Sequence, residues 1–71
     1  MKVDKLIKMA NQIGDFFEAN PDNESAKKDI AGHLQSFWNS VMIESIVAHV
    51  KNKQGEGLHP RVVEAIKQHI V

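Results

Sequence analysis

The sequence predicts an all-α fold, a small bundle of four short helices in a single helical domain that spans residues 1–71. Apolar residues recur at intervals of three and four along four separate segments, which is the period of a helix that buries one face. Residue types that start and end helices separate these segments. Alternation of the strand type extends over no useful length of the chain.

The first helix is predicted over residues 3–19. The Asn20-Pro21 pair ends it, because the residue before a proline is disfavoured in the helical region. The spacing places on one face Val3, Leu6, Ile7, Ala10, Ile13, Gly14 and Phe17.

The second helix is predicted to end near Trp38, and its N-cap is left open between three polar residues, Asn20, Asp22 and Asn23. Its apolar face then consists of Ala26, Ile30, His33, Leu34 and Phe37.

The last two helices are marked by their ends. Asn39 and Ser40 are both suitable N-caps for the third helix, and Gly55 can adopt the left-handed conformation that ends it. The loop around Gly55 precedes Pro60, a residue favoured at the first helical position, with His59 as a weak N-cap.

Composition excludes several classes of function. The chain carries 9 Lys plus Arg against 9 Asp plus Glu, has a formal net charge of +0 and contains no Cys. Nucleic acid is therefore not expected as a partner, since its recognition needs clustered positive charge. Apolar runs fall short of the ~20 residues of a membrane span, which favours a cytoplasmic protein without membrane contact.

No catalytic, cofactor-binding or metal site is expected in this chain. The four histidines, at positions 33, 49, 59 and 69, form no i, i+4 pair and meet no zinc spacing. The serines stand in no nucleophile motif, and the Gly-x-Gly at Gly55 lacks the Lys and Ser or Thr of a phosphate loop.

The aromatic residues are more informative. They form two adjacent pairs, Phe16-Phe17 and Phe37-Trp38, and neighbours on a helix point about 100° apart. The spacing centres Phe17 and Phe37 on the buried faces and moves Phe16 and Trp38 to the edges. These two side chains either fill seams within the bundle or form an exposed patch for a partner protein.

A set of short motifs follows one another along nearly the whole chain. They are Met9–Phe17 (Met-Ala-Asn-Gln-Ile-Gly-Asp-Phe-Phe), Pro21, Ile30–His33 (Ile-Ala-Gly-His), Phe37-Trp38, Met42, Gly55–Pro60 (Gly-Glu-Gly-Leu-His-Pro), Val62 or Val63, and Ala65. In these motifs, in their order and in their separations, the chain resembles the delta subunit of NAD-dependent, molybdenum-containing formate dehydrogenase. The chain departs from the family after Trp38, where a proline and a basic residue are absent, and in its second helix, which has fewer arginines.

The resemblance implies a helical accessory subunit of a cytoplasmic enzyme. The larger subunits of that enzyme hold a molybdopterin guanine dinucleotide, iron–sulfur clusters and FMN, and they pass electrons from formate to NAD. Helical spacing alone makes Asn11 and Gln12 solvated residues. As parts of the family pattern, the best candidates for partner binding are Asn11, Gln12, Phe16, His33 and Trp38, and the alternative for them is a polar network between the first two helices.

The expected function is a non-catalytic subunit that docks on the larger formate dehydrogenase subunits, above all the catalytic one, and supports assembly or stability. The first alternative is a free-standing assembly chaperone that aids insertion of the molybdenum cofactor. The second is a helical protein that associates with itself and acts without the enzyme. Size favours a bound partner, because a core this small rarely supplies more than ~3–5 kcal/mol.

Overall fold

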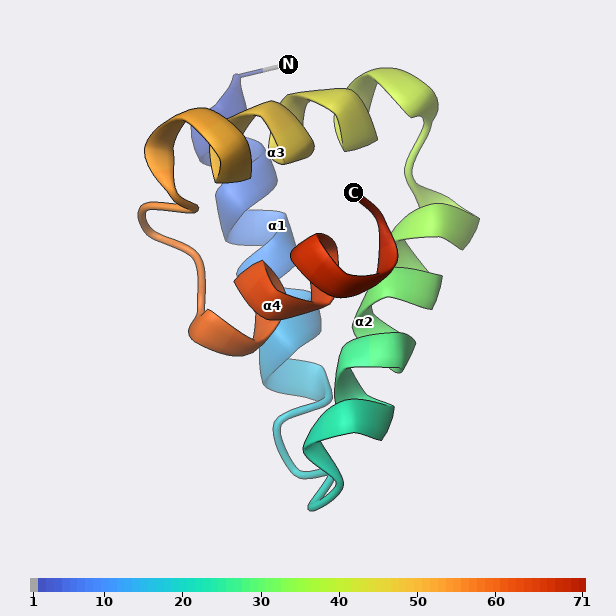
Figure 1. Ribbon diagram of the computed structural model, residues 1–71. Coiled ribbons are helices and arrows are strands. Elements are labelled where there is room, and N and C mark those ends of the chain that lie inside the picture. The colour runs from blue at the N-terminus through green and yellow to red at the C-terminus, as the bar shows by residue number, and fades with distance from the viewer. Residues whose placement is uncertain (1) are drawn as a thin grey trace.

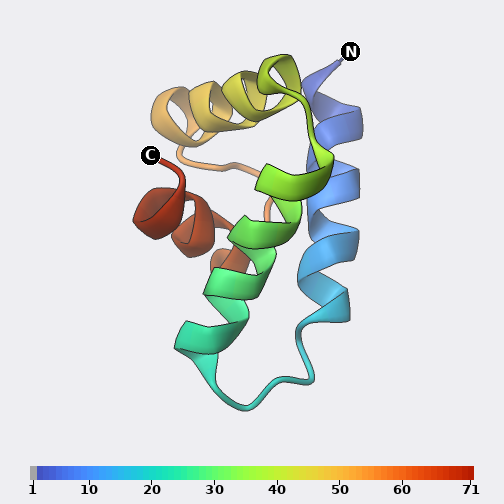
Figure 2. The ribbon, with the colours of Figure 1, turned by 90° about the vertical axis from the view of Figure 1, so that its right-hand side faces the viewer.

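The computed structural model describes residues 2–71, and they form four helices, α1 (Val3–Phe16), α2 (Asn23–Phe37), α3 (Ser40–Lys53) and α4 (Pro60–His69). In Figures 1 and 2, α1 and α2 run side by side in opposite directions, α3 crosses one end of the pair, and α4 lies over one face of it. No strand occurs among residues 2–71. The predicted all-α bundle of four short helices is confirmed.

The hydrophobic core draws on all four helices, and the most extensive contact joins α2 to α4. Its buried members share small or aliphatic side chains, with one indole among them: Leu6, Ala10, Ile30, Leu34, Trp38, Ile46, Val50, Val62, Ala65 and Ile66. The accessible surface is 4489 Å². About 4,400 Å² is expected at this mass, so the chain buries as much surface as others of its size.

Side-chain caps define where α2 and α3 begin. Asp22 accepts hydrogen bonds from the backbone N–H groups of Glu24 and Ser25, which selects it from the three predicted caps. Asn39 accepts from the N–H of Met42 and is the cap of α3. His59 precedes α4 without a side-chain capping bond, as its residue type predicts.

Helix α1 ends at Phe16, three residues before the predicted end. The side chain of Arg61, on α4, donates to the backbone carbonyls of Phe17 at 3.1 Å and Glu18 at 3.4 Å. It also donates to Asn23 Oδ1 at 3.1 Å. Arg61 thus holds the α1–α2 connection in a turn through hydrogen bonds to residues that precede it by 38 to 44 positions in the sequence.

The connection between α3 and α4 begins with two left-handed residues. Gln54 is the C-cap of α3 with φ 57°, and Gly55 follows with φ 71°. The last helical residue is therefore Lys53, and the first left-handed residue is Gln54, one position before the glycine that was predicted to end the helix.

Helices α1 and α4 approach each other closely at Gly14. A Cβ at this position would lie 2.6 Å from Cγ2 of Val62, which is fully buried. This distance is shorter than two carbon atoms tolerate, so only glycine fits here without a shift of α4.

An ion pair between a buried lysine and a half-exposed carboxylate joins α2 to α4. The Lys27 side chain is 5% exposed, and its Nζ lies 2.9 Å from Glu64 and 3.2 Å from Glu24. The hydrogen bond from Lys27 to Glu64 is the main cause of the raised pKa of Lys27. Lys27 therefore differs from a solvated surface lysine, because α4 covers it.

The longest described helix, α2, has 15 residues. Within residues 2–71 no helix combines the length and the apolar content that a membrane crossing requires.

Candidate functional site

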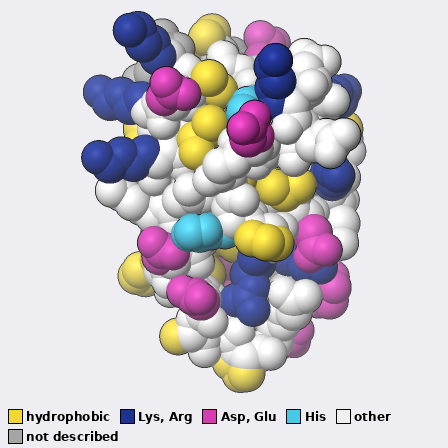
Figure 3. All heavy atoms as spheres, turned by 90° about the vertical axis from the view of Figure 1, so that its left-hand side faces the viewer, with side chains coloured by type: hydrophobic (Ala, Val, Ile, Leu, Met, Phe, Trp, Pro, Cys, Tyr) yellow, Lys and Arg dark blue, Asp and Glu magenta, His cyan; other side chains and the backbone are white. Residues whose placement is uncertain are grey.

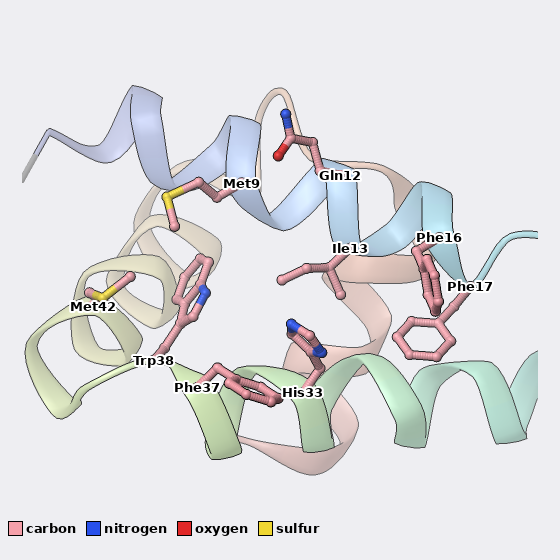
Figure 4. Close-up of a pocket in the computed structure, with 9 residues that line it drawn as sticks. All are labelled: Met9, Gln12, Ile13, Phe16, Phe17, His33, Phe37, Trp38 and Met42. Atoms are coloured by element: carbon pink, nitrogen blue, oxygen red, sulfur yellow. The ribbon is translucent and has the colours of Figure 1, made fainter.

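An open groove of about 460 Å³ lies between α1, α2 and the start of α3. In Figure 4 the groove faces the viewer and α4 lies behind the α1–α2 pair, so the groove is on the face that α4 leaves uncovered. We call it the aromatic groove, and its lining consists of Met9, Gln12, Ile13, Phe16, Phe17, His33, Phe37, Trp38 and Met42.

One wall of the aromatic groove is a face of α1. Met9, Ile13 and Phe16 are spaced four and three residues apart, so they lie on one side of the helix. The ring of Phe16 is 78% exposed and meets the ring of Phe17 edge to face, with centroids 5.0 Å apart. The predicted position of Phe16 at the edge of the buried face is confirmed.

The opposite wall is the C-terminal part of α2. The imidazole of His33 lies between two phenyl rings, with centroids 6.5 Å from Phe17 and 4.6 Å from Phe37. His33 is half-buried and its ring faces the groove (Figure 4). Among the nine lining residues His33 has the sole titratable side chain, and Gln12 has an uncharged polar amide.

Phe37 and Trp38 exchange the places that helical spacing predicts for them. Phe37 is 75% exposed, whereas Trp38 is 7% exposed and belongs to the core. Helix α2 ends at Phe37, and Trp38 has an extended backbone with ψ 141°. The 100° step of a helix therefore does not apply to Trp38, whose side chain turns inward beneath α3.

The indole of Trp38 still has one edge on the aromatic groove. Figure 4 shows its nitrogen on the side that faces Ile13. No residue among those described accepts a hydrogen bond from this N–H, and no fully sealed side-chain nitrogen or oxygen lacks a partner. The indole N–H is therefore a donor that has no acceptor among the described residues and is not sealed from solvent, on a residue that lines the groove.

Asn11 lies outside the aromatic groove. Its side-chain amide donates to the carbonyl of Gly57 at 2.8 Å and accepts from the N–H of His59 at 2.9 Å. The expectations of a solvated Asn11, or of a network to the second helix, are corrected: this side chain fastens the α3–α4 connection to α1. Gln12, one residue further, is exposed at the groove.

Two smaller hollows hold the remaining polar clusters. In one, His59 Nε2 lies 2.8 Å from Asp15 Oδ1, beside Arg61. In the other, His49 Nε2 lies 2.7 Å from the carbonyl of Glu56. Within residues 2–71, no three His, Asp or Glu side chains are placed to hold a metal ion.

The first hollow has Asp15 and Glu18 beside His59 and Arg61, and the lining of the second has Asp4 and Glu56 without a Lys or Arg. The face in Figure 3 shows basic, acidic and apolar side chains interspersed, as the balanced composition predicts.

Sequence reasoning missed most of the aromatic groove. It named Gln12, Phe16, His33 and Trp38, which the structure brings together, and Asn11, which lies elsewhere. A second apolar stripe on the first helix was a usable signal, because Met9, Ile13 and Phe16 repeat at helical spacing beside the core face. The residues that it did not name as site residues are Met9, Ile13, Phe17, Phe37 and Met42.

Comparison with protein families gives one match. The model described as NADH-dependent formate dehydrogenase delta subunit, FdsD, matches residues 5–66 of the 71. Neither a curated protein nor a solved structure matches the chain.

Proposed function

Because the chain belongs to the family of NADH-dependent formate dehydrogenase delta subunits, we propose that it is a non-catalytic accessory subunit that docks on the larger subunits through the aromatic groove. The catalytic subunit is the proposed contact. Docking supports the assembly or the stability of the enzyme.

The observation that carries this proposal is the exposure of Phe16 and Phe37 on the two walls of one groove. Exposed phenyl rings are unfavourable in water, and grouped ones mark protein contact surfaces. Gln12 and His33 add polar groups beside the rings, and interfaces of this kind combine apolar contact with hydrogen bonds.

We propose further that this chain holds no cofactor of its own. It has no Cys for an iron–sulfur cluster, and the described His, Asp and Glu residues do not converge on a common centre. The groove contains one imidazole and no carboxylate. Redox chemistry is therefore assigned to the larger subunits.

Co-purification tests the proposal. The tagged full chain, expressed with the whole enzyme, is expected to elute with the larger subunits, and native mass spectrometry is expected to find it at fixed stoichiometry in the finished enzyme. A chain that elutes alone, and whose deletion leaves formate-dependent NAD reduction intact, contradicts the proposal. Binding to the immature catalytic subunit alone would identify an assembly chaperone instead.

A further inference from the structure

We infer that the aromatic groove receives one amphipathic helix of a larger formate dehydrogenase subunit, which lays apolar side chains between α1 and α2 and brings a hydrogen-bond acceptor to the indole N–H of Trp38. This inference rests on the proposed function, since the helix is supplied by the enzyme. It specifies the shape and chemistry of the contact.

The length of the groove fits about two turns of helix. From Met9 to Phe16 the α1 wall covers roughly 10 Å at the rise of an α-helix. Apolar residues at positions i, i+3 or i+4, and i+7 of a partner helix span the same distance. Figure 4 shows α1 and α2 as two flanking walls with the side chains between them, which is the arrangement that a third helix completes.

The side chains that line the groove favour a partner helix that presents an apolar face to them. Seven of the nine lining residues are apolar or aromatic, and none is Lys, Arg, Asp or Glu. A charged segment would lose its hydration here without an opposite charge to replace it. Met9 and Met42, at the Trp38 end, have flexible side chains that can adjust to an inserted residue.

The indole of Trp38 adds a polar requirement. Trp38 is 7% exposed, no described residue accepts a hydrogen bond from its N–H, and this nitrogen is not sealed from solvent. A largely buried donor is normally paired, so an occupant that expels water from the groove must supply the acceptor itself. A side chain such as Asn, Gln, Asp or Glu on the apolar face of the partner helix meets this requirement.

A second copy of the chain fits the groove less well. Phe16 and Phe37 together expose roughly 300 Å² of ring. A dimer held by these rings alone would bury roughly 600 Å² in total, about half of the ~1,200 Å² at which stable interfaces begin. Two hollow surfaces also leave a void between them, whereas a helix fills one.

Nuclear magnetic resonance can observe the proposed contact directly, because the chain contains one Trp and therefore one indole N–H signal. Overlapping 20-residue peptides that cover the larger subunits of the enzyme serve as probes against the full chain. One peptide, or one overlapping group, is expected to become helical and to move the indole proton downfield, as a new hydrogen bond requires.

Variants locate the contact. Phe37→Ser is expected to weaken binding of that peptide about tenfold or more, since it removes an exposed ring from the groove wall. Val71→Ser is the matched control, because Val71 is an exposed apolar residue outside the groove, and it should change affinity less than about twofold. Circular dichroism checks that both variants remain folded.

Three results would overturn the inference. If the larger subunits co-purify with the chain, yet no peptide moves the indole signal and Phe37→Ser leaves the complex intact, the groove is not the contact; the accessory-subunit role then stands, and docking through the groove does not. If the bound peptide is extended, the occupant is not a helix. If the chain alone sediments as a dimer that Phe37→Ser dissociates, the occupant is a second copy. Failure of all larger subunits to co-purify would instead remove the proposed function.

Discussion

Trp38 and Phe37 are neighbours in the chain, yet one is buried in the core and the other faces solvent. Helical spacing predicts the reverse. For Trp38 it extrapolates the rotation of α2 by one residue past its end, where the backbone is extended. Phe37 is within α2, and its ring is exposed because the face of α2 that it shares with His33 lines the open groove. The identity of the aromatic residues at the site was therefore predictable, but not which ring fills the core.

We expect truncation of Trp38 and truncation of Phe37 to change the free energy of unfolding by very different amounts. Trp38→Ala should lower the free energy of unfolding by about 3–5 kcal/mol, the usual cost of removing a large buried side chain. Phe37→Ala should change it by about 0.5 kcal/mol or less, since the ring is mostly in solvent. Urea denaturation followed by circular dichroism measures both, and equal losses would contradict the assignment of Trp38 to the core.

Asn11 shows a different limit of sequence reasoning. Its two hydrogen-bond partners lie 46 and 48 residues further along the chain, so no local pattern points to them. Asn is a weak helix former, and its presence inside an amphipathic helix was a signal that the side chain has a specific partner. The resemblance to the family drew attention to this residue, and the structure gives it a contact inside the chain.

At the scale of elements, local chemistry predicts where helices begin better than where they end. Asp22, Asn39 and Pro60 mark three starts, because a cap or a fixed φ acts within a few residues. The end of α1 depends on Arg61, which reaches the turn from α4. A contact of this kind follows from the packing of two helices and not from the residues at the turn.

The glycines of α1 and α2 give a matched pair of tests at this scale. Gly14→Ala should destabilise the fold by about 1–2 kcal/mol, because the new methyl group meets the rigid side chain of Val62 in the core. Gly32→Ala should stabilise it by about 0.5–1 kcal/mol, because a Cβ at Gly32 has nothing within 4 Å and alanine favours the helix. Thermal unfolding of both variants measures the difference, and a stabilising Gly14→Ala would show that α1 and α4 can separate slightly.

For the whole molecule, the ion pair between α2 and α4 predicts how stability responds to alkaline pH. The pKa of Lys27 is raised, chiefly by its hydrogen bond to Glu64. A raised pKa in the folded state means that the charged lysine stabilises the fold fully below the ordinary lysine pKa of about 10.4, and that this contribution is lost as the pH rises through the higher folded value.

The melting temperature of the unaltered chain should therefore fall in this alkaline range by more than that of Lys27→Met, which lacks the titrating amine. Lys67→Met, which removes an exposed lysine of α4, is the control. Parallel pH profiles for all three proteins would contradict a stabilising role for the Lys27 charge.

The architecture was more accessible to sequence reasoning than the site. Four amphipathic segments with clear starts leave a small helical bundle as the natural arrangement. The groove, by contrast, arises because α4 covers one face of the α1–α2 pair and leaves the other open. Which face is covered depends on the summed packing of all four helices.

The hydrogen bonds of Asn11 also determine at what point of translation α1 acquires its tertiary contacts. The helix is made first, yet its polar contacts are at Gly57 and His59, and its close packing partner Val62 comes later still. A ribosome that has completed only the first three helices therefore presents an α1 without its final support. We expect the groove to take its shape only once α4 has been translated, because α4 and the connection before it supply the contacts that fix α1.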